Sequence, residues 1–309
     1  GLDFYFTRLE ILLFSCTFGS YSYAGPEKSD YFYINETMRK FTVVCLALAF
    51  STAGVFSATV DTLNVFSEKM NKKIKVVVIK PQTYGGEKTF PVLYLLHGYG
   101  GRYDNWLTKV PHIKELSDQY EMMIVCPDGS IGSWYLDSPE DQASQYETFI
   151  SKELVENVDK NYKTVPSREG RAITGLSMGG HGGLYLGFRN QYIFGACGSM
   201  SGGVDIRPFP NKWDISKRIG TQREYPERWE KNTVMGLLHL LTPDALKIII
   251  DCGTEDFFFD VNERLHNELL YRNIPHDYIT RPGGHNWGYW SNAVKYQVLF
   301  FNEYFRSRQ

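Results

Sequence analysis

The chain has 309 residues, of which 43% are hydrophobic, so it can bury one large α/β core or two small ones. Its formal net charge is -2 and it has no long basic run, which argues against nucleic acid as a partner. The five cysteines have neither Cys-x-x-Cys nor zinc-binding spacing, so the sequence indicates no metal site of that kind and no disulfide framework.

The first part of the chain has the features of an export signal. Met38 is followed by two basic residues and by an apolar run, 41–50, of the length that a signal peptide needs, and small residues then offer a cleavage site. We expect upstream translated sequence over 1–37, a signal peptide over 38–58 and a periplasmic or secreted catalytic domain over 59–309. A membrane anchor is the alternative, but this apolar run is shorter than the ~20 residues that span a bilayer.

The pattern after the signal is that of an α/β domain. Alternating residues predict two half-buried antiparallel strands first, and continuous apolar runs then predict buried parallel strands. The expected strands cover 59–66, 73–80, 91–96, 121–126, 171–174, 194–200, 246–252 and 276–281. The expected helices cover 141–162, the residues after Ser177, 256–272 and 287–305. Strands that alternate with helices imply a mostly parallel sheet with right-handed crossovers.

One segment, 201–243, breaks this alternation. It contains Pro208, Pro210 and Pro226, two tryptophans and many charges, and it shows only short helical pieces. We expect a small cap or long-loop insertion above the carboxyl edge of the sheet, where such folds place specificity.

The motif Gly175-Leu176-Ser177-Met178-Gly179-Gly180 lies between a predicted strand and a predicted helix. Gly-x-Ser-x-Gly in that context is typical of a nucleophile elbow, a strained turn that exposes a reactive serine. Side chains at Gly175 and Gly179 would clash with neighbouring backbone, so glycine is expected at both positions. The N-terminus of the following helix favours the oxyanion formed on attack. Ser177 is therefore the predicted nucleophile.

A serine hydroxyl needs a neighbouring base, and in α/β-hydrolases that histidine comes last in the chain order Ser, acid, His. His285 follows the last predicted strand in a glycine-containing loop, so it is the predicted base. His266 lies within a predicted charged helix and His276 begins a strand, which favours structural roles. His181 lies one turn into the helix after Ser177, where a packed or hydrogen-bonded imidazole is expected.

The acid that orients the base should follow the penultimate predicted strand. Asp251, Glu255, Asp256 and Asp260 all lie near that place. Asp251 is still on the strand, Glu255 precedes the turn into the helix, and Asp260 lies too far into the helix. Asp256 is the predicted acid, and a helix N-cap is its alternative role.

An oxyanion hole needs two backbone N–H groups that point at the developing negative charge. One should come from Met178, the residue after the nucleophile, and the other from the loop after the strand that ends at Leu96. Tyr99 is the predicted second donor, with Gly98 as the alternative.

Several motifs, taken together, carry a family resemblance. They are His97-Gly98-Tyr99-Gly100-Gly101, Asn105-Trp106, Pro127-Asp128-Gly129, Ser133-Trp134-Tyr135, Gly175 to Gly180, Asp251-Cys252-Gly253 and Gly284-His285-Asn286-Trp287. In this order they resemble the esterase D superfamily, and most of all the secreted bacterial feruloyl and acetylxylan esterases of the first carbohydrate esterase family. The resemblance runs from about Thr59 to the C-terminus.

This resemblance implies an α/β-hydrolase fold, a mostly parallel central sheet with helices on both faces, and no metal or other cofactor. It also implies the triad Ser177, Asp256 and His285, with oxyanion donors at Tyr99 and Met178. The partner would be an ester substrate, an acylated oligo- or polysaccharide of plant origin, and the sequence leaves the oligomeric state open. Four aromatic residues are candidates to line an acyl or sugar groove, with core packing as the alternative: Trp106, Trp134, Tyr135 and Trp287.

Other functions stay open at this stage. The same superfamily contains S-formylglutathione hydrolases and acyltransferases, which share the acyl-enzyme chemistry. A non-catalytic carbohydrate-binding protein on the same scaffold would be expected to lack part of the triad, whereas here all three members occur in order.

Overall fold

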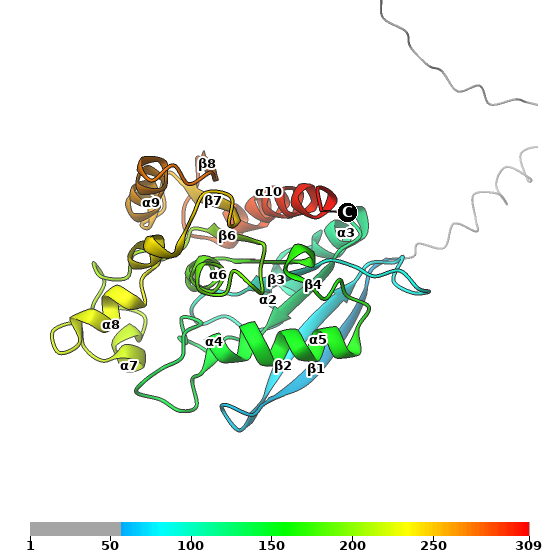
Figure 1. Ribbon diagram of the computed structural model, residues 1–309, viewed down its shortest axis with the longest axis horizontal. Coiled ribbons are helices and arrows are strands. Elements are labelled where there is room, and N and C mark those ends of the chain that lie inside the picture. The colour runs from blue at the N-terminus through cyan, green and yellow to red at the C-terminus, as the bar shows by residue number, and fades with distance from the viewer. Residues whose placement is uncertain (1–56, 309) are drawn as a thin grey trace, which may run out of the picture. The chain divides into compact units, whose positions relative to one another are not determined.

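The computed structural model describes residues 57–308. The predicted upstream sequence, 1–37, and the predicted signal peptide, 38–58, except for its last two residues, lie outside the described residues. The described part forms one eight-stranded sheet with the order β1-β2-β4-β3-β5-β6-β7-β8 (Figure 1). Its strands are β1 (Thr59–Ser67), β2 (Lys72–Lys80), β3 (Val92–Leu96), β4 (Met123–Pro127), β5 (Arg171–Gly175), β6 (Ala196–Met200), β7 (Lys247–Gly253) and β8 (Asp277–Arg281).

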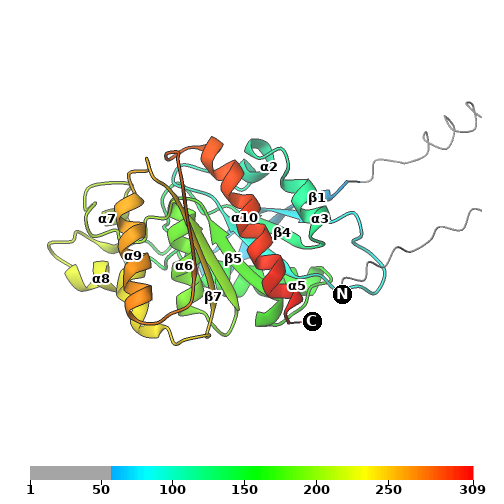
Figure 2. The same cartoon turned by 90° about the horizontal axis from the view of Figure 1, so that it is seen from above.

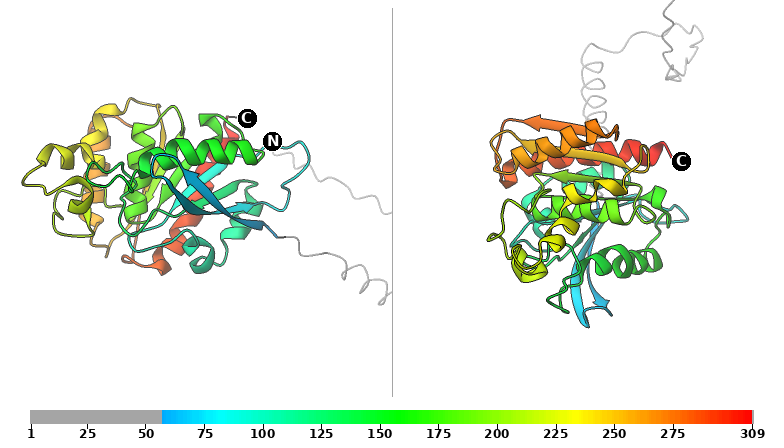
Figure 3. Two further views of the ribbon diagram at one scale, coloured as in Figure 1. Left: turned by 90° about the horizontal axis from the view of Figure 1, so that it is seen from below. Right: turned by 60° about the vertical axis from the view of Figure 1, so that its left-hand side comes forward.

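The sheet has the predicted mixture of strand directions. β1 pairs with β2 in an antiparallel register that places Thr59 opposite Lys80, and β2 joins β4 in the same antiparallel sense. The remaining strands, from β4 to β8, are parallel. The long β1–β2 hairpin extends past the shorter strands at one edge (Figure 3). The α/β-hydrolase fold is thereby confirmed.

Helices cover both faces of the sheet (Figure 2). One face carries α2 (Asn105–Lys109), α3 (Ile113–Gln119) and α10 (Trp287–Arg306), and the other carries α4 (Tyr146–Thr148), η1 (Phe149–Leu154), α5 (Val155–Asn161), α6 (Met178–Arg189) and α9 (Phe259–Tyr271). The strands alternate their side chains between two apolar clusters. Leu93 and Leu95 of β3 pack toward α10, whereas Tyr94 packs toward α6. Within 57–308, no helix is long and apolar enough to cross a membrane.

The predicted helix over 141–162 begins later than expected, at Tyr146. The side-chain amide nitrogen of Gln145, Nε2, donates to the carbonyl oxygens of Ser138 and Asp141, at 2.7 and 2.9 Å, so the residues before Tyr146 form a closed turn. The helix then passes through a π-helical stretch, η1. Sequence periodicity did not indicate α2 and α3, the short helices between β3 and β4.

The segment 201–243, for which a cap or insertion is predicted, contains α7 (Ile215–Ile219), α8 (Pro226–Lys231) and the 3-10 helix η3 (Val234–Leu240). α7 and α8 lie together at one end of the sheet (Figure 1). The three helices are short and are joined by loops, which agrees with the interrupted sequence pattern.

α6 approaches the sheet so closely that it has almost no room for side chains on that face. A Cβ atom at Gly183 would lie 2.4 Å from the carbonyl oxygen of Gly198 on β6. The added Cβ would be fixed to the backbone of α6, and the Gly198 oxygen is part of the backbone of β6. Neither atom could therefore move aside without shifting the helix or the strand. Glycine at this position therefore sets the distance between α6 and the sheet.

His181 of α6 ties two distant segments to this helix. Its side chain is buried, and its ring nitrogens lie 3.1 Å from the Trp134 carbonyl oxygen and 2.8 Å from the Asn232 carbonyl oxygen. This is the packed, hydrogen-bonded imidazole that the sequence indicates. Burial lowers the pKa of His181 to about 4, against hydrogen bonds to the two carbonyls that raise it. The ring is therefore neutral near pH 7 and donates to one of the two oxygens.

We predict that Gly183→Ala destabilises the protein by about 1–3 kcal/mol, because the added methyl group overpacks the contact between α6 and β6. Urea unfolding followed by circular dichroism measures the loss. Gly284→Ala is the matched control, since its nearest atom would be 3.4 Å away. Equal stability of Gly183→Ala and the wild type would contradict this account of the α6 contact.

We also predict that stability falls on acidification between pH 6.5 and about 4 in part through His181. In this range the unfolded chain binds a proton at this histidine and the folded chain does not, so acid favours unfolding. The free energy of unfolding should therefore depend less steeply on pH in His181→Gln than in the wild type. Identical slopes for the two proteins would exclude this contribution.

Candidate active site

Ser177 lies at a sharp turn between β5 and α6. Its φ and ψ are 56° and -116°, a strained conformation for a residue with a side chain. A Cβ at Gly179 would lie 2.6 Å from the carbonyl oxygens of Leu96 and His97, and one at Gly175 would lie 2.6 Å from that of Gly179. The expected need for glycine at both positions is confirmed. Glycine at both positions lets the turn lie against the end of β3.

A continuous chain of hydrogen bonds leads from Ser177 into the protein. His285 Nε2 lies 2.9 Å from Ser177 Oγ, and His285 Nδ1 lies 3.0 and 2.9 Å from the two carboxylate oxygens of Asp256. A carboxylate only accepts hydrogen bonds, so Nδ1 carries the proton and Nε2 is free to accept one from the serine hydroxyl. The structure thus brings together the three residues predicted from the sequence.

The loops that carry Asp256 and His285 are joined to each other. The amide of Thr254 donates to the Arg281 carbonyl at 2.9 Å, and the amide of Glu255 donates to the Gly283 carbonyl at 3.0 Å. The Asp256 carboxylate is inaccessible to solvent, and it also accepts a hydrogen bond from the backbone amide of Phe258 at 2.8 Å. The position of the Asp256 carboxylate is therefore fixed both by the hydrogen bonds between the two loops and by the Phe258 amide.

The alternative acids occupy other environments. Asp251 is buried at the end of β7, where it accepts hydrogen bonds from Arg281 and from the Tyr289 hydroxyl, at 2.5 and 2.6 Å. Burial raises the pKa of Asp251, and the contacts with Tyr289 and Arg281 oppose that shift. Glu255 and Asp260 are exposed. None of these three carboxylates is a hydrogen-bond partner of His285 in the described structure.

Two further histidines, His266 and His276, lie away from Ser177. Their rings hydrogen-bond each other, with 2.8 Å between Nδ1 of His266 and Nε2 of His276. His266 also stacks on Tyr278. These contacts agree with the structural roles that the sequence indicates.

The loop after β3 lies directly beside Ser177. A Cβ at Gly98 would come within 3.3 Å of Ser177 Cβ. The amides of Tyr99 and Met178 have no hydrogen-bond acceptor within residues 57–308, and Met178 opens the 12-residue helix α6. Both amides are therefore available to an anion at this place.

His97 fixes the conformation of this loop. It is buried; its Nε2 accepts a hydrogen bond from the Gly129 amide at 2.7 Å, so its Nδ1 is the donor to the Gly98 carbonyl at 2.8 Å. Burial lowers the pKa of His97, which favours the neutral ring, and the two hydrogen bonds select its tautomer. The Tyr135 hydroxyl donates to the His97 carbonyl at 3.0 Å. Hydrogen bonds of the buried His97 and Tyr135 side chains thus fix the loop after β3.

A pocket of about 390 Å³ opens beside Ser177 and His285. Five aromatic side chains line it, and these are Tyr99, Trp213, Phe257, Trp287 and Trp290. A volume of this size is typical of small-molecule sites, and flat aromatic walls favour apolar or planar groups.

The pocket differs from the expected groove. Trp287 lines it, but Trp106, Trp134 and Tyr135 are at most 1% exposed and pack in the core. The indole N–H of Trp106 donates to the Leu96 carbonyl at 3.1 Å, so this side chain supports β3. The expectation that these three line the groove is corrected: they lie behind it.

Three aromatic lining residues were not identified from the sequence. Phe257 directly follows Asp256, and Trp290 lies three residues after Trp287 on the same helix, so their positions relative to known site residues could have indicated both. Trp213 lies in the segment without periodicity and offered no such signal.

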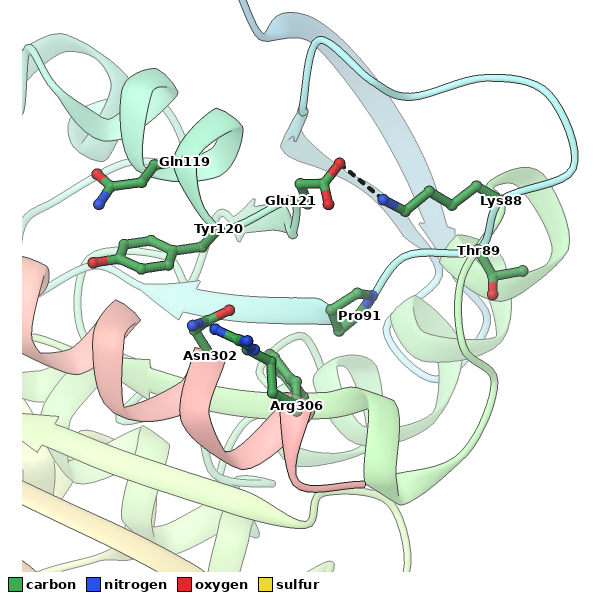
Figure 4. A pocket seen from close by; sticks show the side chains of 9 residues that line it. Lys88, Thr89, Pro91, Gln119, Tyr120, Glu121, Asn302 and Arg306 are labelled. Carbon is green, nitrogen blue, oxygen red and sulfur yellow. Dashed lines mark ion pairs between the residues drawn. The ribbon is translucent and has the colours of Figure 1, made fainter. Parts of the chain in front are cut away.

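A second pocket, of about 440 Å³, lies near the start of β3 (Figure 4). Lys88 and Glu121 form an ion pair of 2.8 Å there, and Gln119 and Arg306 complete a polar lining. None of the predicted site residues reaches it. The pocket beside Ser177 lies instead at the carboxyl ends of the parallel strands, where open α/β sheets bind ligands. Within 57–308, no group of three histidine, cysteine or acidic side chains could hold a metal ion.

Comparison with known proteins agrees with the fold. The model of the esterase family, described as "Putative esterase", matches residues 67–301. An acetyl esterase of Caldicellulosiruptor saccharolyticus is 27% identical over 258 residues, which are 75% of this chain and 94% of that protein. An esterase of Mycobacterium tuberculosis is 33% identical over 237 residues, which are 68% of this chain and 52% of that protein.

The solved structure of a ferulic acid esterase is 30% identical, with a TM-score of 0.71, and the match covers 81% of this chain and 99% of that one. The family match covers most of the described residues and includes both the serine turn and the histidine loop. The chain therefore belongs to the esterase family, and the activity that this membership indicates is hydrolysis of carboxylic esters.

Proposed function

We propose that the chain is a secreted serine carboxylesterase that removes feruloyl or acetyl groups from plant polysaccharides or their fragments. The observation that carries the proposal is the hydrogen-bonded chain from Ser177 through His285 to the buried Asp256. In this constellation the imidazole makes a weakly nucleophilic hydroxyl reactive at neutral pH.

In the proposed reaction Ser177 Oγ attacks the ester carbonyl carbon while its proton moves to His285 Nε2. The imidazolium then gives this proton to the oxygen of the leaving alcohol as the ester C–O bond breaks, and an acyl-enzyme remains. Water next gives a proton to His285 while its oxygen attacks the acyl carbon; the imidazolium then gives that proton to Ser177 Oγ as the acyl C–O bond breaks, which releases the acid and restores the serine. Asp256 keeps the imidazole oriented and stabilises its charged form.

The tetrahedral intermediates carry negative charge on the former carbonyl oxygen. We assign the amides of Tyr99 and Met178 as its hydrogen-bond donors. Their lack of an acceptor among the described residues and the closeness of Gly98 to Ser177 support this assignment. Such a donor contributes about 10²–10³ in rate in other enzymes.

The aromatic pocket and the acetyl and ferulic acid esterase relatives support the proposed acyl groups. The predicted signal over 38–58 supports secretion and an extracellular polymer as substrate. The alternative is a general esterase or thioesterase like the S-formylglutathione hydrolases, or an acyltransferase in which a sugar hydroxyl replaces water. Comparing purified protein on methyl ferulate, acetylated xylan, p-nitrophenyl acetate and S-formylglutathione discriminates among the hydrolytic activities.

We predict that Ser177→Ala abolishes hydrolysis of p-nitrophenyl acetate, since it removes the hydroxyl that His285 activates in the proposed mechanism. Mass spectrometry of the wild type, quenched during turnover, should find the acetyl group on Ser177. Circular dichroism and thermal unfolding verify that the variant stays folded. Substantial hydrolysis by a folded Ser177→Ala protein would refute the proposed mechanism.

We predict that Asp256→Asn lowers kcat by about 10³–10⁴, because the amide no longer holds the productive imidazole tautomer. Asp260→Asn is the matched control: it neutralises an exposed carboxylate four residues away, and its kcat should stay within about twofold. Steady-state kinetics on p-nitrophenyl acetate distinguishes the two. Similar kcat values for both variants would remove Asp256 from the triad.

A further inference from the structure

Trp213 and Asp214 form an unusual corner at the start of α7. Their φ values are 50° and 56°, so two consecutive residues with side chains adopt the left-handed conformation. Tryptophan rarely adopts it, and strain of this kind persists only where surrounding contacts impose it. The contacts that hold this corner therefore indicate what it does.

Side chains from two other segments hold the corner. The indole N–H of the buried Trp134 donates to the Trp213 carbonyl at 3.0 Å. The hydroxyl of Tyr99 donates to Asp214 Oδ2 at 2.9 Å, and Lys217 forms an ion pair with Asp214 Oδ1 at 2.9 Å. The hydrogen bond of Tyr99 connects the loop after β3, which lies against Ser177, to the segment between β6 and β7.

Tyr99 has few other restraints. Its side chain is 39% exposed, and one edge of its ring lies over Gly132, where a Cβ would come within 2.9 Å of Tyr99 Cε2. Its hydroxyl is 115 residues from Asp214 in sequence, and Asp214 is its only hydrogen-bond partner within residues 57–308. Without this acceptor, nothing polar among these residues would keep the ring at the pocket.

The same corner supplies a second part of the pocket wall. Trp213 stacks on Phe257 with 5.8 Å between ring centroids and an interplanar angle of 18°, and Phe257 in turn contacts the ring of His285. Trp213, Phe257 and Tyr99 all line the pocket. The backbone conformation of the corner therefore orients the Trp213 ring, and the Asp214 carboxylate orients the Tyr99 ring.

We propose that Asp214 determines acyl specificity by holding the Tyr99 ring as a wall of the ester pocket, which favours planar aromatic acyl groups over acetyl. This inference rests on the proposed ester hydrolysis at Ser177. A feruloyl ring gains from contact with fixed aromatic walls, whereas an acetyl group is too small to use them. Asp214 acts through Tyr99 and is a positioning residue.

The test compares Tyr99→Phe, Asp214→Gly and Asp214→Asn. Tyr99→Phe removes only the hydroxyl. Asp214→Gly removes the acceptor while glycine accepts the left-handed backbone without strain. Asp214→Asn keeps both an oxygen acceptor and tolerance of positive φ. Tyr162→Phe is the matched control, since it removes a tyrosine hydroxyl that donates to Asp61 at 3.0 Å, far from Ser177 in the fold.

The measured quantity is kcat/KM for methyl ferulate divided by kcat/KM for p-nitrophenyl acetate. Loss of one hydrogen bond that positions the wall should lower this ratio about fivefold in Tyr99→Phe and Asp214→Gly, mainly through KM for the ferulate. The double variant should fall no further, because both changes remove the same contact. Asp214→Asn and Tyr162→Phe should keep the wild-type ratio.

The proposal is overturned if both Tyr99→Phe and Asp214→Gly retain the wild-type ratio, or if Asp214→Asn behaves like Asp214→Gly. Binding of ferulate, followed by quenching of tryptophan fluorescence in a Ser177→Ala background, gives a readout without catalysis. There the same two variants should bind ferulate about fivefold more weakly. Unchanged binding also overturns the proposal, whereas weakened binding in a protein that hydrolyses no ester would refute the proposed function alone.

Discussion

The close approach of α6 to the ends of β3 and β5 is the constraint on which the site depends. Because residues 175 and 179 are glycines, no side chain clashes with the carbonyl oxygens of Leu96, His97 and Gly179. The turn can then place Ser177 against the loop after β3, in a strained backbone conformation that projects its hydroxyl. Glycines further along α6 extend the same close contact to β6.

Around this rigid turn, the remaining site residues come from loops that the sheet brings together. Pairing of β7 with β8 places the Asp256 and His285 loops side by side, and two backbone hydrogen bonds join them. Behind them, buried Asp251 binds both Arg281 of β8 and Tyr289 of α10. Removing one partner of such a buried charge is costly, so this cluster fixes the loops without taking part in the proposed chemistry.

The aromatic side chains divide between support and contact. Trp106, Trp134 and Tyr135 use their polar atoms to hold the carbonyls of Leu96, Trp213 and His97. They therefore set the positions of β3, of the corner before α7 and of the loop beside Ser177. Two of the side chains that line the pocket, Tyr99 and Trp213, come from these supported segments, whereas Phe257 follows β7 and Trp287 and Trp290 lie on α10.

The local sequence determined the secondary structure and the sharp turn at Ser177. Periodicity gave the eight strands and the long helices, and the glycines around Ser177 predicted a turn that only such residues permit. Chain order then selected Asp256 and His285. Tertiary structure alone decided which of the four candidate aromatic rings line the pocket, because the sequence around a tryptophan does not show whether its side chain packs into the core or faces a pocket. The same holds for Trp213 and Asp214, whose backbone conformation is imposed by hydrogen bonds from distant residues rather than by their neighbours in the chain.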